Sequence, residues 1–191
     1  NYMIKAVREA KRYTSWSNVN ADYEGKVVEM VEDAFRNKEF QRVFLEYEGK
    51  IRRLGMIKSL SLLALKVLSP GIPDFYQGTE TWRYLLTDPD NRAPVNFSKL
   101  REILHRSREF DEQMVKDMND GRIKVYVTHK LLHLRKTRAG EFLDRAYEPL
   151  DLPEGLCGFR RGNVVLVVKT SAGLADARVR VEGKYVDLLT G

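Results

Sequence analysis

The sequence predicts an α+β fold in which helices come first and an antiparallel β module comes last. Up to about residue 140, apolar residues recur mainly at three- and four-residue steps, which is the period of a helix. Beyond Leu143 they alternate or run together over strand lengths, and turn residues separate the runs. Between the helical patterns lies one short strand-like segment, Ile72 to Tyr76.

Five helical patterns precede the β module. The third continues through an apolar run toward Pro70, and Asp120 with Gly121 separates the last two. The expected helices cover about Tyr2–Tyr13, Ala21–Arg36, Glu39–Leu54 with its continuation, Ser98–Asn119 and Arg122–Thr137.

The strand-like segment lies in the stretch SPGIPDFYQGTETW, residues 69–82. Pro70 and Gly71 end the helical pattern, residues 72–76 are apolar at alternate positions, and Gly78 interrupts them. Thr79 then suits a helix N-cap or a turn. An isolated strand leaves its backbone groups unpaired, so we expect residues outside this sequence to supply its sheet. The spacing alone is equally compatible with a buried strand followed by an ordinary turn.

Four strand-like segments make up the C-terminal module. Hairpin turns are expected at Gly162-Asn163 and Glu182-Gly183. The segments are residues 145–152, 156–161, 163–170 and 177–189.

Length, composition and charge set broad limits. The chain has 191 residues, 43% of them hydrophobic, which suits one domain or one and part of another. The net charge of +6 is spread over helical faces that also carry many carboxylates, so it argues only weakly for nucleic-acid binding. The chain begins without Met and ends inside a strand-like pattern, so we expect it to be part of a longer protein.

Cysteine content and hydropathy bear on location. A single cysteine, Cys157, excludes an internal disulfide framework and a thiolate zinc site. The most apolar run, Leu60 to Leu68, is interrupted by Ser61 and Lys66 and is too short to span a bilayer. With no secretory signal visible, we expect a cytoplasmic protein without a membrane partner.

One motif resembles a known family. The eighth barrel strand of the α-amylase-type glycoside hydrolase clan has the approximate pattern P-G-x-P-x-x-Y-x-G-x-E, which is matched at residues 70–80. Gln77, Thr79, the run DPDNR at 88–92, REAKRYTSW at 8–16 and FLDRAYEPLDL at 142–152 together resemble the trehalose-forming branch, the maltooligosyl trehalose synthase family.

The resemblance implies a fold. Residues 1–140 would be the C-terminal part of a catalytic (β/α)8 barrel with a helical insertion, contributing its last strand, and residues 141–191 part of an antiparallel β-sandwich domain. The missing N-terminal barrel portion would be the partner of this chain. Strand eight would bring its polar tip to the C-terminal rim, where barrel enzymes place their active sites.

The resemblance also implies an activity. The family converts the reducing-end α-1,4 link of a maltooligosaccharide into an α,α-1,1 link through a glycosyl-enzyme, with a carboxylate nucleophile and an acid. Those groups and a third Asp lie on earlier barrel strands, so we assign no catalytic residue in this chain. The clan's last catalytic Asp follows a His, but the histidines here, at 105, 129 and 133, precede Arg106, Lys130 and Leu134 and suit surface or packing positions.

The candidate site residues are therefore substrate-binding ones. Amides and carboxylates can hydrogen-bond sugar hydroxyls, and flat aromatic rings can cover the apolar faces of sugar rings. The candidates are Lys11, Thr14, Ser15, Trp16, Gln77, Glu80, Trp82, Asp88, Asp90, Asn91 and Arg92.

Two of these groups also have a structural interpretation. Trp16 could pack on the neighbouring helix while the nearby hydroxyls cap it. Residues 88–92 have the composition of a tight turn, and Arg92 could pair with Asp88 or Asp90 to hold that loop.

Two other functions remain open. One is a free-standing carbohydrate-binding or assembly module that works with a separate catalytic chain. The other is a basic helical nucleic-acid binder, whose binding would weaken steeply with salt. No phosphate-binding glycine loop or metal constellation is visible, so we expect no cofactor and no metal.

Overall fold

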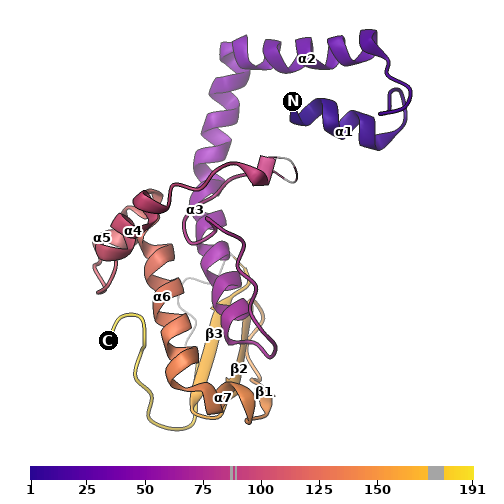
Figure 1. The fold of residues 1–191 in the computed structure, drawn as a ribbon. Coiled ribbons are helices and arrows are strands. Elements are labelled where there is room, and N and C mark those ends of the chain that lie inside the picture. The colour runs from indigo at the N-terminus through magenta and orange to yellow at the C-terminus, as the bar shows by residue number, and fades with distance from the viewer. Residues whose placement is uncertain (87, 89, 172–178) are drawn as a thin grey trace. The chain divides into compact units, whose positions relative to one another are not determined.

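The computed structural model describes residues 1–86, 88, 90–171 and 179–191 (Figure 1). They divide into two compact units: Asn1–Arg52 with Tyr84–Pro94, and Arg53–Arg83 with Val95–Gly191. The division differs from the predicted boundary at residue 140, which concerned barrel and sandwich and stays a prediction.

Unit 1 contains α1 (Tyr2–Ala10), α2 (Ala21–Arg36) and the first part of α3. Helix α1 ends three residues earlier than predicted because Lys11 adopts the left-handed conformation, with φ 54°, and its N–H bonds to the Arg8 carbonyl. The predicted bounds of α2 are confirmed, and the Asn20 side chain caps it by accepting from the Tyr23 N–H.

Helix α3 (Lys38–Leu68) is one continuous helix, which confirms the predicted continuation. It begins after Asn37, whose side chain accepts a hydrogen bond from the Phe40 N–H, and it ends shortly before Pro70. Ion pairs at three- and four-residue spacing, such as Arg42 with Glu39 and Lys50 with Glu46, support its exposed first half.

Unit 2 continues α3 and adds shorter helices. These are α4 (Phe97–His105), α5 (Gln113–Lys116), η2 (Met118–Asp120), α6 (Arg122–Thr137) and α7 (Ala139–Leu143). The single helix predicted over 98–119 is wrong. The side chains of Asp111 and Asp117 accept the N–H groups of Gln113 and Asn119, and this local bonding starts new turns in place of a continuous helix.

The C-terminal module of unit 2 is a three-stranded antiparallel sheet in the order β1-β2-β3. The strands are β1 (Tyr147–Pro149), β2 (Leu156–Arg161) and β3 (Val164–Lys169). Arg161 pairs with Val164 across the predicted Gly162-Asn163 turn, which is confirmed, and Gly162 has the positive φ of 54° that this turn needs. The observed fold class is thus a set of helices followed by an antiparallel sheet, whereas the complete β-sandwich stays a prediction.

The fourth predicted strand is wrong over its described part, residues 179–189, and its first two residues lie outside the described ranges. The Asp187 carboxylate accepts the N–H groups of Leu189 and Thr190 and forms a turn there. The Leu189 carbonyl accepts a hydrogen bond of 2.7 Å from the Tyr126 hydroxyl of α6. These contacts replace ladder hydrogen bonds, and the expected hairpin at Glu182-Gly183 is only a bend.

Residues 72–76 are not a strand in this structure. Their backbone groups meet no neighbouring strand within the described chain, and the segment runs irregularly into a turn at residues 77–80. Thr79 donates to the Tyr76 carbonyl from both its N–H and its hydroxyl, at 3.1 and 2.6 Å. The turn expected at Thr79 is present, while a strand formed within a larger barrel stays a prediction.

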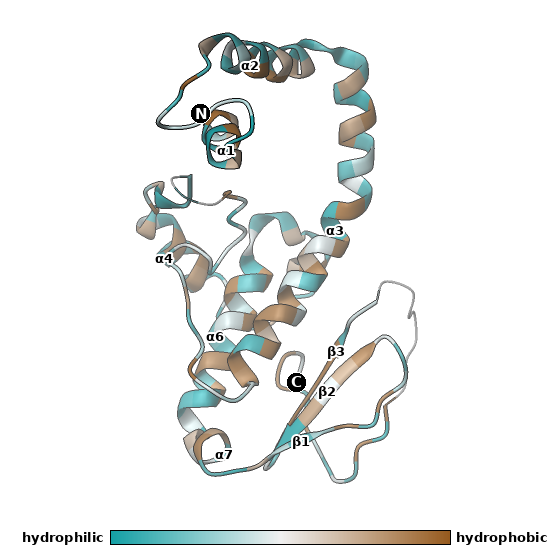
Figure 2. Cartoon of the chain, turned by 90° about the vertical axis from the view of Figure 1, so that its right-hand side faces the viewer, coloured by the Kyte–Doolittle hydropathy of each residue, from teal (hydrophilic) through white to brown (hydrophobic). Residues whose placement is uncertain are grey.

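The core of unit 2 joins the second half of α3 to α6 and the sheet. Val67 and Tyr126 are almost wholly buried there, together with Phe159 of β2. Figure 2 shows the hydrophobic residues concentrated along β2 and β3 and recurring along α6. This core fixes the segment from Phe75 to Trp82, because both of those aromatic side chains pack against it.

Candidate functional site

The first candidate group, Lys11 to Trp16, follows α1 in unit 1. Thr14 is buried, and its hydroxyl donates to the Glu24 Oε1 at 2.6 Å while accepting from the Asn20 N–H at 3.0 Å. The Glu24 carboxylate also accepts two hydrogen bonds of 2.7 Å from the Arg8 guanidinium. Hydrogen bonds from Arg8 and then Thr14 lower the pKa of Glu24 to about 2.

Trp16 lies at the surface of the same loop, 58% exposed, with the Arg8 guanidinium carbon 4.9 Å from its ring centroid. The Ser15 hydroxyl accepts from the Asn18 N–H at 3.0 Å and so helps to close the loop. Lys11 is exposed. Thr14 and Ser15 are therefore occupied with local structure, while Trp16 and Lys11 present surface that a ligand could contact.

The second group, Gln77, Glu80 and Trp82, belongs to unit 2. Gln77 is exposed at the turn, and Trp82 is partly buried with its indole N–H donating to the Met118 carbonyl. Glu80 is partly buried, and its Oε2 is buried without a hydrogen-bond partner among the described residues. A carboxylate oxygen in that state is available to an additional donor.

Lys124 of α6 contacts the residues that follow this turn. Its ammonium donates to the Thr81 carbonyl at 3.0 Å and lies 5.3 Å from the Trp82 ring centroid. Burial, and then the charge of Lys66, lower the pKa of Lys124, while Glu80 acts in the opposite direction. A hollow of about 170 Å³ lies here, lined by Ser59, Leu62, Leu63, Lys66, Thr79 and Lys124.

The third group, residues 88–92, returns to unit 1. Arg92 pairs with Asp88, which is the loop-holding pair that the sequence left open, and Asp90 accepts the Leu86 N–H at 2.7 Å. Asn91 lies in the short helix η1 (Asp90–Arg92), with its side-chain oxygen buried and unpartnered among the described residues. The loop is held by its own polar groups, and contact with sugar there stays a prediction.

The candidates thus divide between the two units. Lys11 to Trp16 and Asp88 to Arg92 belong to unit 1, and Gln77 to Trp82 belong to unit 2. That all three groups line one substrate site stays a prediction. Sequence reasoning did not single out Arg8, Glu24 or Lys124, because each acts through a contact between residues far apart in the chain.

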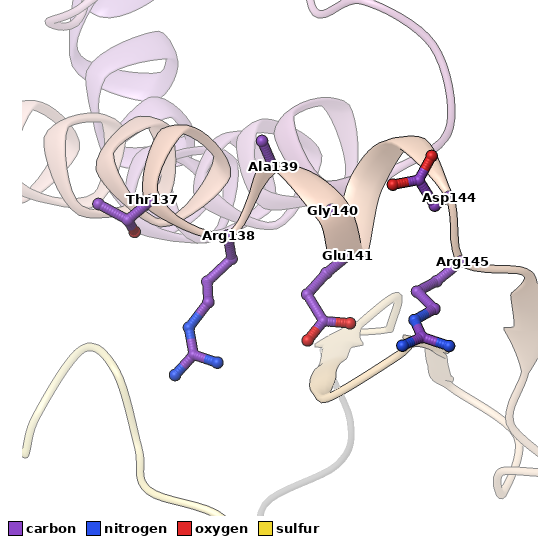
Figure 3. Close-up of a pocket in the computed structure, with 7 residues that line it drawn as sticks. All are labelled: Thr137, Arg138, Ala139, Gly140, Glu141, Asp144 and Arg145. Carbon is purple, nitrogen blue, oxygen red and sulfur yellow. The ribbon is translucent and has the colours of Figure 1, made fainter.

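A further hollow, of about 330 Å³, lies where α6 meets α7. Figure 3 shows the side chains of Arg138, Glu141 and Arg145 extending to the same side of this turn. Glu141 accepts hydrogen bonds from the backbone and side chain of Asn163 in the β2–β3 turn, so at least one of its lining groups is structural.

All three histidines are exposed, in line with the surface positions predicted for them. Within the described ranges, no group of three or more His, Cys, Asp or Glu side chains is placed to hold a metal ion. No helix in the same ranges has the length and apolarity needed to cross a membrane.

Comparison with known proteins shows which proteins the chain resembles. A family model described as a domain of unknown function, DUF1953, matches residues 146–191. A protein of Mycobacterium tuberculosis named putative maltooligosyl trehalose synthase is 34% identical over 179 residues, which is 88% of this chain and 21% of that protein.

Solved structures agree. A crystal structure of maltooligosyl trehalose synthase matches 99% of this chain with 56% identity and a TM-score of 0.94, over 26% of its own length. The structure of a hypothetical maltooligosyl trehalose synthase from Sulfolobus tokodaii matches 99% of the chain with 49% identity and a TM-score of 0.88, over 25% of its length.

The chain spans only about a fifth to a quarter of the length of the relatives it matches. Over 88–99% of its own length the chain is similar to maltooligosyl trehalose synthases, and it matches a C-terminal portion of them. The resemblance seen in the sequence is confirmed.

Proposed function

We propose that the chain is part of an enzyme that converts the reducing-end α-1,4 link of maltooligosaccharides into an α,α-1,1 link by intramolecular transglycosylation. The observation that carries this is the match of 99% of the chain, at 56% identity and a TM-score of 0.94, to a maltooligosyl trehalose synthase. The glycosyl-enzyme must be kept from water, so binding groups around the reducing end matter as much as the catalytic ones.

The catalytic carboxylates belong to the part of the enzyme outside this chain. By the resemblance, the nucleophile, the acid and the third Asp lie on barrel strands that precede the segment at residues 72–76. The chain alone is therefore expected to be inactive.

The role of this chain is to bind the sugar and to complete the barrel. Lys11, Trp16, Gln77 and Glu80 offer exposed or unpartnered groups of the kinds that sugars need. In the same proposal, residues 72–76 become the last barrel strand once neighbouring strands are present, residues 1–140 form the end of the barrel domain, and residues 141–191 contribute to a β-sandwich. The cytoplasmic location expected from the sequence belongs to this proposal too.

Several exposed apolar side chains are consistent with a surface that the rest of the enzyme covers. Ile72 is 96% exposed and Leu62 65% in unit 2. In unit 1, Phe40, Phe44 and Tyr47 of α3 are all more than half exposed. Such side chains are normally covered, and the remaining three quarters of the enzyme's length is the natural cover.

The alternative of a free-standing binding module is not favoured. The relatives carry this portion within one longer chain, of which it makes up 21–26%. A separate catalytic polypeptide is therefore not needed.

The test is the activity of the complete enzyme that contains this chain. Incubated with maltopentaose, it should remove reducing ends and form a non-reducing product of unchanged mass, because isomerisation adds no water. Products shortened by hydrolysis, with reducing ends increasing in number, would overturn the proposal.

A further inference from the structure

We propose that Trp16 is a platform for one pyranose ring of the substrate, and that Arg8 and Glu24 are positioning residues that hold it. The inference rests on the proposed function and adds to it two positioning residues, Arg8 and Glu24, that were not among the candidate site residues.

The support beneath Trp16 is a buried polar network. Glu24 is 8% exposed and Thr14 is 4% exposed, and both are hydrogen-bonded to other members of the network. The Arg8 guanidinium forms a two-pronged ion pair with the Glu24 carboxylate, a geometry that fixes the guanidinium plane. The network joins α1 to α2 across the loop that carries Trp16.

The Arg8 guanidinium then fixes the tryptophan. It lies over the indole with its central carbon 4.9 Å from the ring centroid, so it occupies one face of the ring. Trp16 nevertheless stays 58% exposed. A large aromatic ring held on one face by a charge that is itself anchored leaves its other face open for a ligand.

A ring held in this way suits a sugar. The C–H faces of a pyranose are apolar and flat, so an indole can cover one while polar side chains at the edge meet the hydroxyls. Because the ring is already ordered, binding costs less conformational entropy than it would on a free side chain.

The loop that carries Trp16 also contains polar residues. Lys11 is exposed, and it is the only non-glycine residue with positive φ among the described residues. The hydroxyls of Ser15 and Ser17 lie 3.4 Å apart on the same loop.

The competing interpretation is that Trp16 is covered by another part of the enzyme and only stabilises the fold. Substitution would then lower the melting temperature and leave substrate binding unchanged. The platform predicts the opposite, because an exposed ring contributes little to folding.

The experiment uses the complete enzyme, whose wild-type form must first isomerise maltopentaose; if it does not, the proposed function itself fails and the platform is rejected with it. Trp16→Ala should raise KM about tenfold, equivalent to about 1.4 kcal/mol of binding, with a smaller change in kcat and an unchanged melting temperature. Trp16→Phe keeps a flat ring and should restore most of the lost binding.

Arg8→Lys and Glu24→Gln test the positioning. Each should raise KM about threefold, because the ring loses its fixed orientation, and Arg8→Lys combined with Trp16→Ala should add nothing to Trp16→Ala alone. Arg42→Lys is the matched control, because Arg42 forms the same two-pronged pair with Glu39, at 3.0 and 2.7 Å, on the exposed surface of α3. An active enzyme whose KM is unchanged by Trp16→Ala would overturn the platform and leave the proposed function standing.

Discussion

Glu24 links the stability of unit 1 to pH. Its folded pKa of about 2 lies below the ordinary value of a free glutamate, since Arg8 and Thr14 hydrogen-bond to the ionised form. A carboxyl whose pKa is lowered by folding stabilises the folded state above its unfolded pKa. That contribution is lost as the pH falls from about 4.5 toward 2.

Glu24→Gln should therefore remove an acid-dependent part of the stability. The melting temperature of unit 1 should fall less steeply between pH 5 and about pH 2 in the variant than in the wild type. The chain has two tryptophans, so a Trp82→Phe background makes Trp16 fluorescence a reporter of this unit. Parallel pH profiles for the two proteins would show that Glu24 is not paired in solution.

Glu80 allows a prediction about the reaction's outcome. Its Oε2 is buried and unpartnered among the described residues. This oxygen can therefore accept a hydrogen bond from the substrate or from a substrate-binding loop. In the complete enzyme, Glu80→Gln should keep the side-chain shape but lose a charge-assisted hydrogen bond worth about 1.5 to 3 kcal/mol. A looser reducing-end pocket admits water, so the ratio of free glucose to non-reducing product should rise.

The control for Glu80→Gln is the melting temperature, measured on the same sample. A large fall with an unchanged product ratio would identify Glu80 as a structural carboxylate.

At the scale of elements, α6 provides the clearest stability prediction. Leu131 is 3% exposed and belongs to the core, whereas its neighbour Leu132 is 38% exposed. Leu131→Ala should destabilise unit 2 by about 2 to 5 kcal/mol, because it leaves a cavity among α3, α6 and the sheet. Leu132→Ala should cost much less. Denaturant unfolding followed by Trp82 fluorescence in a Trp16→Phe background measures both, and equal costs would contradict the core as described.

Elements with a strong period of their own could be predicted from the sequence. Helix α2, the long helix α3, α6 and the Gly162-Asn163 hairpin were predicted because their signals are local. The helix over 98–119 was wrong because Asp111 and Asp117 bond to their own backbone. Residues 72–76 carry a strand pattern, but a strand needs partner strands that the described part of the chain does not supply.

For the candidate site, the sequence indicated individual side chains but not the contacts that hold them. Residue types on loops, such as Trp16 and Glu80, could be singled out from the motif. Their supports could not, because the Arg8–Glu24 pair joins residues 16 positions apart and the contact of Lys124 with Thr81 spans 43. Contacts of that kind depend on how helices pack, and periodicity does not report it.

At the scale of the whole molecule, our proposal is that the chain supplies binding groups and a folded C-terminal portion to a longer enzyme. The basis of that view is the pair of coverages in the comparisons. The relatives match 88–99% of this chain, whereas the chain matches only about a quarter or less of each relative.

The most direct test of this division of labour is an assay of the purified 191-residue chain with maltopentaose, run beside the complete enzyme. Reducing ends are counted over time, and anomeric proton signals report any α,α-1,1 link. We predict conversion by the complete enzyme and none by the chain alone. Time-dependent loss of reducing ends with the chain alone would contradict the account, because it would place the catalytic carboxylates within these residues.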